Sequence, residues 1–78
     1  MESLLNLKVG RKAKIVNIDN MLPAKIIKRL NELGFVRGNK IKMLYKNSFA
    51  KACIVSIYST PITIDFNVVK HVMVEELK

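Results

Sequence analysis

The chain of 78 residues contains one cysteine, one histidine and no tryptophan. The single cysteine, Cys53, cannot form an internal disulfide, which is typical of a protein from a reducing compartment. It lies in an apolar segment and is expected to pack there as a small hydrophobic residue, with a nucleophile as the alternative. The histidine, His71, has no second metal-binding side chain at ligand spacing, so it is expected to be solvated or to cap a helix.

Catalytic and phosphate-binding motifs are also missing. The sequence has no C-x-x-C, H-E-x-x-H or G-x-S-x-G motif, and its three glycines are too few and too far apart for a phosphate-binding loop. Three methionines, Met21, Met43 and Met73, could suggest a soft-metal site, but without cysteine or histidine beside them they are typical of core filler. We therefore expect no enzyme activity, no cofactor and no stable metal site.

Long hydrophobic runs are absent as well. No segment approaches the roughly 18 apolar residues that a membrane-spanning helix needs. The N-terminal stretch MESLLNLKVG lacks the basic start and apolar centre of a secretory signal. A chain of this length suits one domain and is too short for two, so the sequence predicts a single cytosolic domain over residues 1–78.

Acidic residues are few. Six of them stand against 14 lysines and arginines, which gives a formal net charge of +8. Such an excess would attract a nucleic acid, an anionic lipid surface or an acidic protein. The densest groups, RKAK at 11–14 and KIIKR at 25–29, are shorter than the charge runs of disordered basic tails. Charge alone does not distinguish a surface that is merely solvated from one that binds nucleic acid.

Five segments have the composition or the alternation of β-strands: 11–19, 39–47, 52–58, 60–66 and 72–76. Alternation is clearest in 39–47, where Ile41, Met43 and Tyr45 are expected on one buried face. Pro61 favours an edge position for segment 60–66, because proline cannot donate to a strand ladder.

One helix is predicted over residues 22–33, since Leu22, Ile26, Leu30 and Leu33 recur at helical spacing. Its candidate N-caps are Asp19 and Asn20, with Pro23 in the first turn. A single helical turn capped by Asn67 is expected within 67–72. One helix inserted after the first of five or six short strands predicts a mainly β fold, in which a small bent sheet closes into a barrel.

The stretch RLNELGFVRG, residues 29–38, predicts how this helix ends. With Leu33 as the C-cap, Gly34 would take the left-handed conformation that follows many helices. Phe35 would then pack on Leu30, which completes a Schellman motif. Gly38 is expected to make a tight turn into the next strand. The stretch can therefore be explained by structure alone.

The same residues carry a resemblance to a known family. LKVGRKAKIVNID, RLNELGFVRGNKIKML and VKHVMVEE, in this order, resemble the ferrous iron transport protein A (FeoA) family, over about residues 7–76. The pattern R-L-x-x-L-G-F-x-x-G is the most specific part, and L-x-x-G precedes it. The residues that match these two patterns are Arg29, Leu30, Leu33, Gly34, Phe35 and Gly38, preceded by Leu7 and Gly10. The last third departs from the family, which usually has a glycine near Ser59-Thr60-Pro61 and Ala-Leu-Arg in place of Thr63–Asp65.

The resemblance implies an SH3-like barrel and an accessory role in ferrous iron uptake. Proteins of this kind are thought to act by protein–protein interaction with the cytosolic GTP-binding part of the ferrous iron permease, a FeoB-like protein. They would carry no iron themselves and would reach the inner face of the membrane through that partner. The clustered charge at Lys25, Lys28 and Arg29 makes the outer face of the helix the candidate contact surface.

The alternative is a small basic barrel that binds RNA or DNA. A single-strand binder needs exposed aromatic rings on which bases can stack. Because Phe35, Tyr45 and Phe66 are expected in the core, few rings would remain for stacking. Nucleic acid is therefore the less favoured partner.

Overall fold

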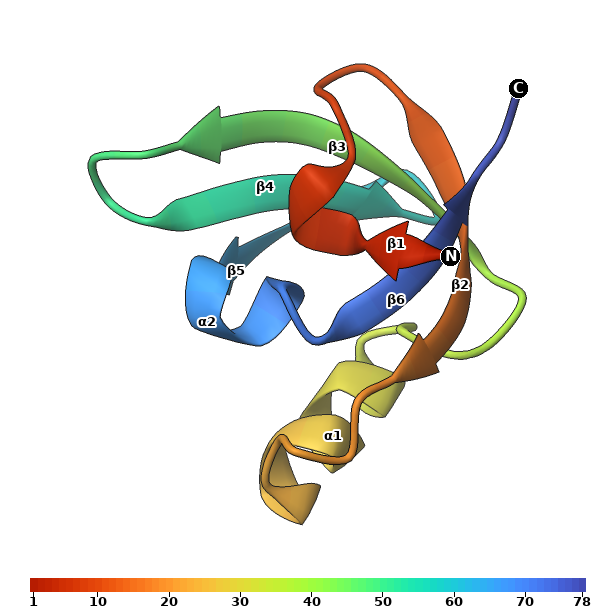
Figure 1. Cartoon of the computed structure of the whole chain (residues 1–78), viewed down its shortest axis with the longest axis vertical. Helices are drawn as coiled ribbons and strands as arrows, with labels where there is room; N and C mark the ends of the chain where they lie inside the picture. The colour runs from red at the N-terminus through yellow and green to blue at the C-terminus, as the bar shows by residue number, and fades with distance from the viewer.

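Six short strands form one antiparallel sheet with the strand order β1-β6-β2-β3-β4-β5 (Figure 1). The computed structural model describes all 78 residues of the chain. The elements are β1 (Glu2–Ser3), the 3-10 helix η1 (Leu4–Asn6), β2 (Lys12–Ile18), α1 (Ala24–Glu32), β3 (Lys40–Asn47), β4 (Ala52–Ile57), β5 (Thr60–Asp65), α2 (Phe66–Val69) and β6 (Val72–Glu76). The mainly β fold with a helix between its first two long strands is confirmed.

Two register shifts bend this sheet. One lies in β2 between Ile15 and Asn17, where it pairs with β6, and the other lies in β3 between Met43 and Tyr45, where it pairs with β4. Each shift inserts one extra residue into a strand, which increases the local twist and curls the sheet. The end strands β1 and β5 are not paired with each other, and α2 contacts both β5 and η1 at the open side. The sheet is thus a barrel whose gap is covered by two short helices.

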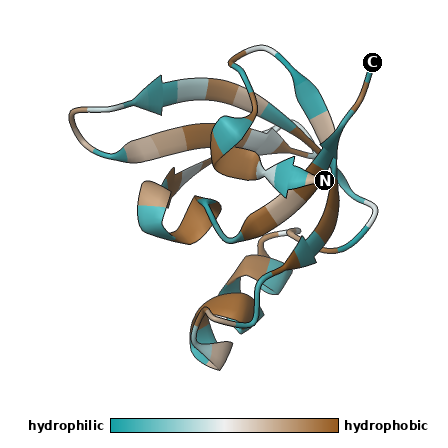
Figure 2. Ribbon diagram, in the orientation of Figure 1, coloured by the Kyte–Doolittle hydropathy of each residue, from teal (hydrophilic) through white to brown (hydrophobic).

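The concave side of the sheet contains the core, and every fully buried residue is apolar. Figure 2 shows hydrophobic segments along η1, β4 and β6, and each of these elements contributes buried residues to the core. The buried residues are Leu4, Leu7, Ala13, Ile15, Leu22, Leu30, Phe35, Ile41, Met43, Cys53, Val55, Ile57, Ile64, Val69, Val72 and Val74. No buried side-chain nitrogen or oxygen lacks a hydrogen-bond partner.

The predicted strands agree with β2 to β6, and Pro61 lies on β5 at the sheet edge as expected. The prediction for Tyr45 was wrong, because this side chain is 52% exposed. The extra residue at the β3 register shift resets the alternation after Met43, so Tyr45 no longer shares its face. Strand β1 was not predicted either, since two residues are too few to show a period.

Both predicted helix caps need correction. The residue at the N-cap of α1 is Pro23, with no side-chain capping bond, and the Asp19 carboxylate accepts a hydrogen bond from the Met21 N–H at 3.0 Å in the preceding loop. The second helix begins at Phe66, so its N-cap is Asp65 and Asn67 lies inside the helix. Asp19 therefore stabilises the loop before α1 and does not cap the helix, and Asn67 is an interior residue of α2.

Neither α1 nor α2 has the length and apolar character of a membrane-spanning helix.

Candidate interaction surface on helix α1

The end of α1 forms the corner that its sequence predicts. Leu33 is the C-cap, and Gly34 follows with φ = +105°. The Phe35 N–H donates to the Leu30 carbonyl at 2.9 Å, and the Gly34 N–H donates to the Asn31 carbonyl at 3.1 Å. These are the two hydrogen bonds of a Schellman motif, so this prediction is confirmed.

The turn between β4 and β5 packs against this corner. A Cβ atom on Gly34 would lie 3.0 Å from Cγ2 of Ile57, a contact so tight that the Ile57 side chain would have to move by a few tenths of an ångström. The Asn39 amide donates to the Gly34 carbonyl at 2.8 Å, and the Tyr58 hydroxyl donates to Oδ1 of the same Asn39 at 3.0 Å. Glycine is therefore favoured at position 34 both by its backbone angle and by the close approach of Ile57 at the end of β4.

The other motif residues also have structural positions. The N–H of Gly38 donates to the Ile15 carbonyl at 2.8 Å, which joins the loop after the corner to β2. Gly10 joins the preceding loop to β3, because its N–H donates to the Met43 carbonyl at 2.7 Å. Leu7 is fully buried. Of the eight motif residues, only Arg29 presents a charged side chain to solvent.

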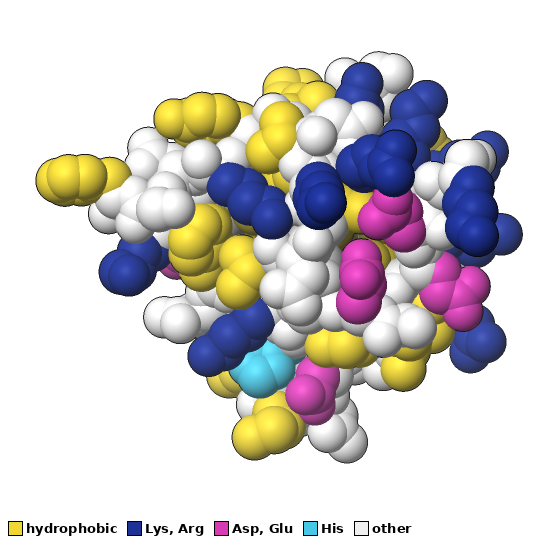
Figure 3. Space-filling model, turned by 45° about the horizontal axis from the view of Figure 1, so that its top comes forward, with side chains coloured by type: hydrophobic (Ala, Val, Ile, Leu, Met, Phe, Trp, Pro, Cys, Tyr) yellow, Lys and Arg dark blue, Asp and Glu magenta, His cyan; other side chains and the backbone are white.

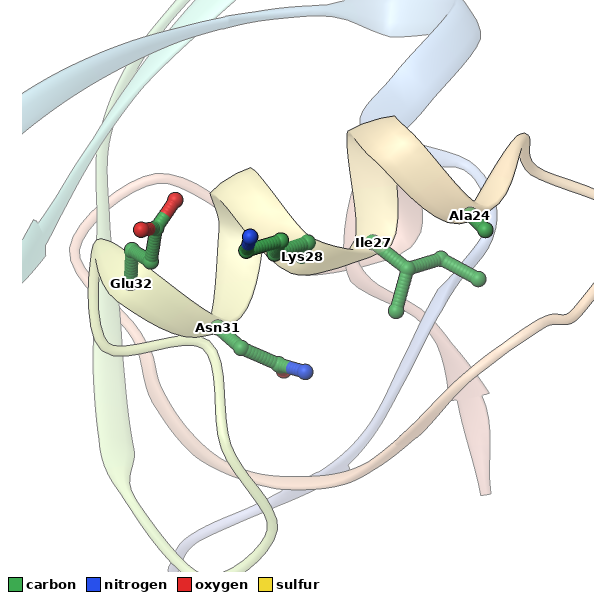
Figure 4. A pocket seen from close by; sticks show the side chains of 5 residues that line it. All are labelled: Ala24, Ile27, Lys28, Asn31 and Glu32. Atoms are coloured by element: carbon green, nitrogen blue, oxygen red, sulfur yellow. The ribbon is translucent and has the colours of Figure 1, made fainter.

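Lys25, Lys28 and Arg29 are all exposed on α1. Their spacing of three and four residues places them on one stripe of the helix surface. None of the three forms an ion pair, so their charge is free to meet a partner. Lys28 borders a shallow, open hollow of about 460 Å³ on the outer side of the helix (Figure 4). The other residues of this hollow are Ala24, Ile27, Asn31 and Glu32.

Arg29 lies beside a second, more apolar feature. It borders a groove of about 300 Å³ between α1 and the edge of the sheet, with Asp65 and Thr63 on the far side. The apolar residues of the groove come from α1, β5 and α2, and they are Ile26, Leu30, Leu33, Ile62, Ile64 and Val68. The sequence showed the hydrophobic residues of α1 and those of β5 separately. It carried no signal that they face each other across a groove.

The groups with metal-binding chemistry form one pair and no larger cluster. Nδ1 of His71 lies 3.4 Å from Oδ2 of Asp19, and no third carboxylate, thiol or imidazole joins them. The hydrogen bond from the Met21 N–H lowers the pKa of Asp19 below its usual value. Burial acts in the opposite direction, and His71 adds to the lowering. The absence of a stable metal site in this chain remains a prediction.

Cys53 is buried on β4, and this burial raises the pKa of its thiol, although Lys46 nearby acts in the opposite direction. Because the thiolate is the reactive form, we expect Cys53 to react with a thiol reagent at neutral pH at least about tenfold more slowly in the folded protein than in denaturant. The absorbance of the released thiol chromophore measures both rates. A fast stoichiometric reaction under native conditions would instead indicate a reactive cysteine.

The bent sheet, with one helix after its first long strand, defines a small SH3-like barrel. FeoA of Stenotrophomonas maltophilia, a prokaryotic SH3-domain protein solved in complex with zinc, is 25% identical and superposes with a TM-score of 0.83 over 96% of this chain and 91% of that one. FeoA of Chlorobium tepidum is 26% identical, with a TM-score of 0.88 over 97% of this chain and 70% of that one. A manganese-dependent transcriptional repressor, at 17% identity and a TM-score of 0.88 over 36% of its length, shares the fold.

The model of the FeoA domain matches residues 2–76, and the chain belongs to this family. The family is linked to ferrous iron transport and consists of small SH3-like accessory domains rather than a known class of enzymes. A search of curated proteins gave no significant match.

Proposed function

We propose that this protein is a cytosolic accessory factor of ferrous iron uptake that binds the GTP-binding part of a ferrous iron permease. The family match over residues 2–76 is the observation that carries the proposal. In support, the Stenotrophomonas maltophilia relative has been suggested to act as a ferrous iron transport activating factor. The protein would act by contact and would neither carry iron nor catalyse a reaction.

Helix α1 supplies the surface that this contact needs. The cationic stripe of Lys25, Lys28 and Arg29 would speed the encounter with an acidic partner, because complementary charge steers association. The apolar groove beside Arg29 would then accept hydrophobic side chains of that partner, which supply most of the affinity in protein interfaces. Arg29, Leu30 and Leu33 of the motif belong to this surface themselves, and the other motif residues hold both features in place.

Reversal of two charges tests this surface. The Lys25→Glu/Lys28→Glu variant is expected to keep its thermal midpoint, because both side chains are exposed and unpaired. Its affinity for the purified cytosolic GTP-binding part of the permease is expected to fall by about tenfold, mainly through a slower association rate. Surface plasmon resonance with and without GTP measures the affinity and the rate.

Lys8→Glu/Lys70→Glu is the matched control, since it changes the net charge equally at exposed positions outside α1. Equal weakening by both variants would show that only the overall charge matters. No binding by the unmodified protein, together with unchanged iron uptake in a deletion strain, would overturn the proposed function.

A further inference from the structure

Four lysines stand on the outer face of the sheet in two directly opposed pairs. Lys12 of β2 lies opposite Lys42 of β3, and Lys14 lies opposite Lys40. Directly opposed residues have Cβ atoms about 5 Å apart, and like charges at this distance destabilise a sheet. None of the four forms an ion pair, although Glu75 of β6 lies opposite Lys14. We call these four residues the lysine face.

A hollow of about 490 Å³ opens at the lysine face. Lys12, Lys40 and Lys42 line it together with the hydroxyl-bearing residues Ser56, Tyr58 and Ser59, and its lining contains no carboxylate. Ammonium groups and hydroxyls are the groups that bind phosphate oxygens in proteins. The hollow therefore has the chemistry of a site for a phosphate group.

The register shift in β3 adds apolar side chains to the same face. Leu44 is the extra residue at the shift, and it lines the lysine hollow. Tyr45 follows it and lies opposite Ile54 of β4. Leu44 is 38% and Tyr45 is 52% exposed. The outer side of β3 thus changes from cationic to apolar as it approaches the hairpin.

The apex of the β3–β4 hairpin ends in Phe49, whose side chain is 99% exposed. The Asn47 side chain orders this apex, because its Oδ1 accepts from the N–H of Phe49 at 2.9 Å and from that of Ala50 at 3.0 Å. Lys46 and Lys51 flank the loop. The hairpin extends away from the barrel in Figure 1, its apex carries a hydrophobic segment in Figure 2, and hydrophobic side chains project on the same side in Figure 3.

We propose that this surface docks the protein on an anionic phospholipid bilayer. The lysine face binds headgroup phosphates, while Phe49 and the apolar residues of β3 enter the interfacial layer. A projecting, ordered phenylalanine beside exposed leucine and tyrosine is the apolar component of peripheral membrane binding, and lysines near the surface add attraction to anionic lipids. A free phosphate ion would leave Phe49 without a function. A single strand of nucleic acid would stack its bases on the exposed rings of Tyr45 and Tyr58, but it gains nothing from the apolar side chain of Leu44.

The bilayer contact goes beyond the proposed permease contact and does not rest on it. Binding of the chain to pure lipid vesicles, which contain no permease, tests only the lysine face and the hairpin apex. The permease experiment tests α1. Failure of one proposal therefore leaves the other standing.

Vesicle sedimentation is the first test. The full chain is expected to bind vesicles that contain phosphatidylglycerol, with binding reduced by salt, and to leave pure phosphatidylcholine vesicles unbound. Phe49→Ser is expected to lower the partition coefficient by about tenfold, since a phenylalanine side chain loses its apolar burial. The control is Met21→Ser, which removes a side chain that is 77% exposed in the loop before α1 and is expected to change nothing. Equal binding by Phe49→Ser, or no binding of the unmodified chain, overturns the proposal.

A fluorescent reporter gives the depth of the apex. The chain contains no tryptophan, so Phe49→Trp and Met21→Trp each carry a single probe. With anionic vesicles, the emission of Phe49→Trp is expected to shift to the blue and to be quenched by lipids with brominated acyl chains. Met21→Trp is expected to show neither effect. Vesicle binding without any shift for Phe49→Trp would exclude insertion and overturn the proposal.

A variant of the lysine face separates weaker vesicle binding from loss of folding, because it is expected to be more stable than the unmodified protein. Lys12→Gln/Lys42→Gln removes one directly opposed pair, so it is expected to raise the thermal midpoint. The same variant is expected to weaken vesicle binding by about 25-fold, at about fivefold for each lysine. Lys25→Gln/Lys28→Gln on α1 is the charge-matched control. Unchanged vesicle binding by the Lys12→Gln/Lys42→Gln variant would overturn the proposal.

Nucleic acid is the competing occupant. Binding of a single-stranded oligonucleotide at physiological salt, without binding to anionic vesicles, would assign the face to nucleic acid and overturn the proposal. Vesicle binding that persists in the presence of that oligonucleotide supports it.

Discussion

Replacement of Phe35 by alanine is expected to remove a large part of the stability of the protein. Phe35 is fully buried directly after the left-handed glycine, and its N–H closes the end of α1 on Leu30. Truncation of a buried phenylalanine costs about 3–5 kcal/mol. The total stability of a domain of this size is only about 4–12 kcal/mol, so this loss is a large part of it. Urea unfolding followed by circular dichroism measures the change.

Phe49→Ala is the matched control, because it makes the same chemical change at a side chain that is 99% exposed. Its free energy of unfolding is expected to change by no more than about 0.5 kcal/mol. If Phe35→Ala were equally mild, the corner would not be the centre of the core, and the packing described for α1 would be wrong.

The second large effect is expected for Gly34→Val, with a loss of about 2–5 kcal/mol. A residue with a Cβ atom resists the backbone conformation of Gly34 by about 1–2 kcal/mol. The new side chain would also collide with Ile57, and overpacking of this kind costs about 1–3 kcal/mol. Thermal and urea unfolding of the variant measure the sum.

Alanine at the three glycines separates these two causes. Gly10, Gly34 and Gly38 all have positive φ angles, of +89°, +105° and +92°, but a Cβ atom has a neighbour within 4 Å only at Gly34. Gly10→Ala and Gly38→Ala therefore report the backbone cost alone, and the additional loss in Gly34→Ala reports the contact with Ile57. If all three variants lost the same free energy of unfolding, Ile57 of β4 would accommodate the new Cβ atom without an energetic penalty.

The sequence predicts those parts of the structure that depend on residues close together in the chain. The end of α1 depends on neighbours in the chain, so Leu30, Gly34 and Phe35 were enough to predict both hydrogen bonds of the corner. The strands followed from alternation in the same way. Tyr45 was misplaced because a register shift depends on how β3 meets β4, and a period of two in one strand contains no information about its partner.

The surfaces were less predictable than the core. Lys25, Lys28 and Arg29 could be placed on one helix stripe from their spacing alone. The groove beside Arg29 needs Ile62 and Ile64 to come from a distant strand, and the lysine face needs the exact register of β2 against β3. Pairings between segments far apart in the chain are set by the whole fold, so no local pattern reveals them.

The position of β6 has a consequence for biosynthesis. This strand, Val72–Glu76, lies between β1 and β2, so the first strands of the chain have their hydrogen-bond partner at its far end. Small domains fold as units during synthesis, and sheets built from distant segments form late. The barrel cannot close on the ribosome until residue 76 has emerged. A nascent chain stopped before β6 would expose the apolar side chains of η1 and β2, such as Leu4 and Ile15, which makes it a substrate for chaperones rather than a partly active protein.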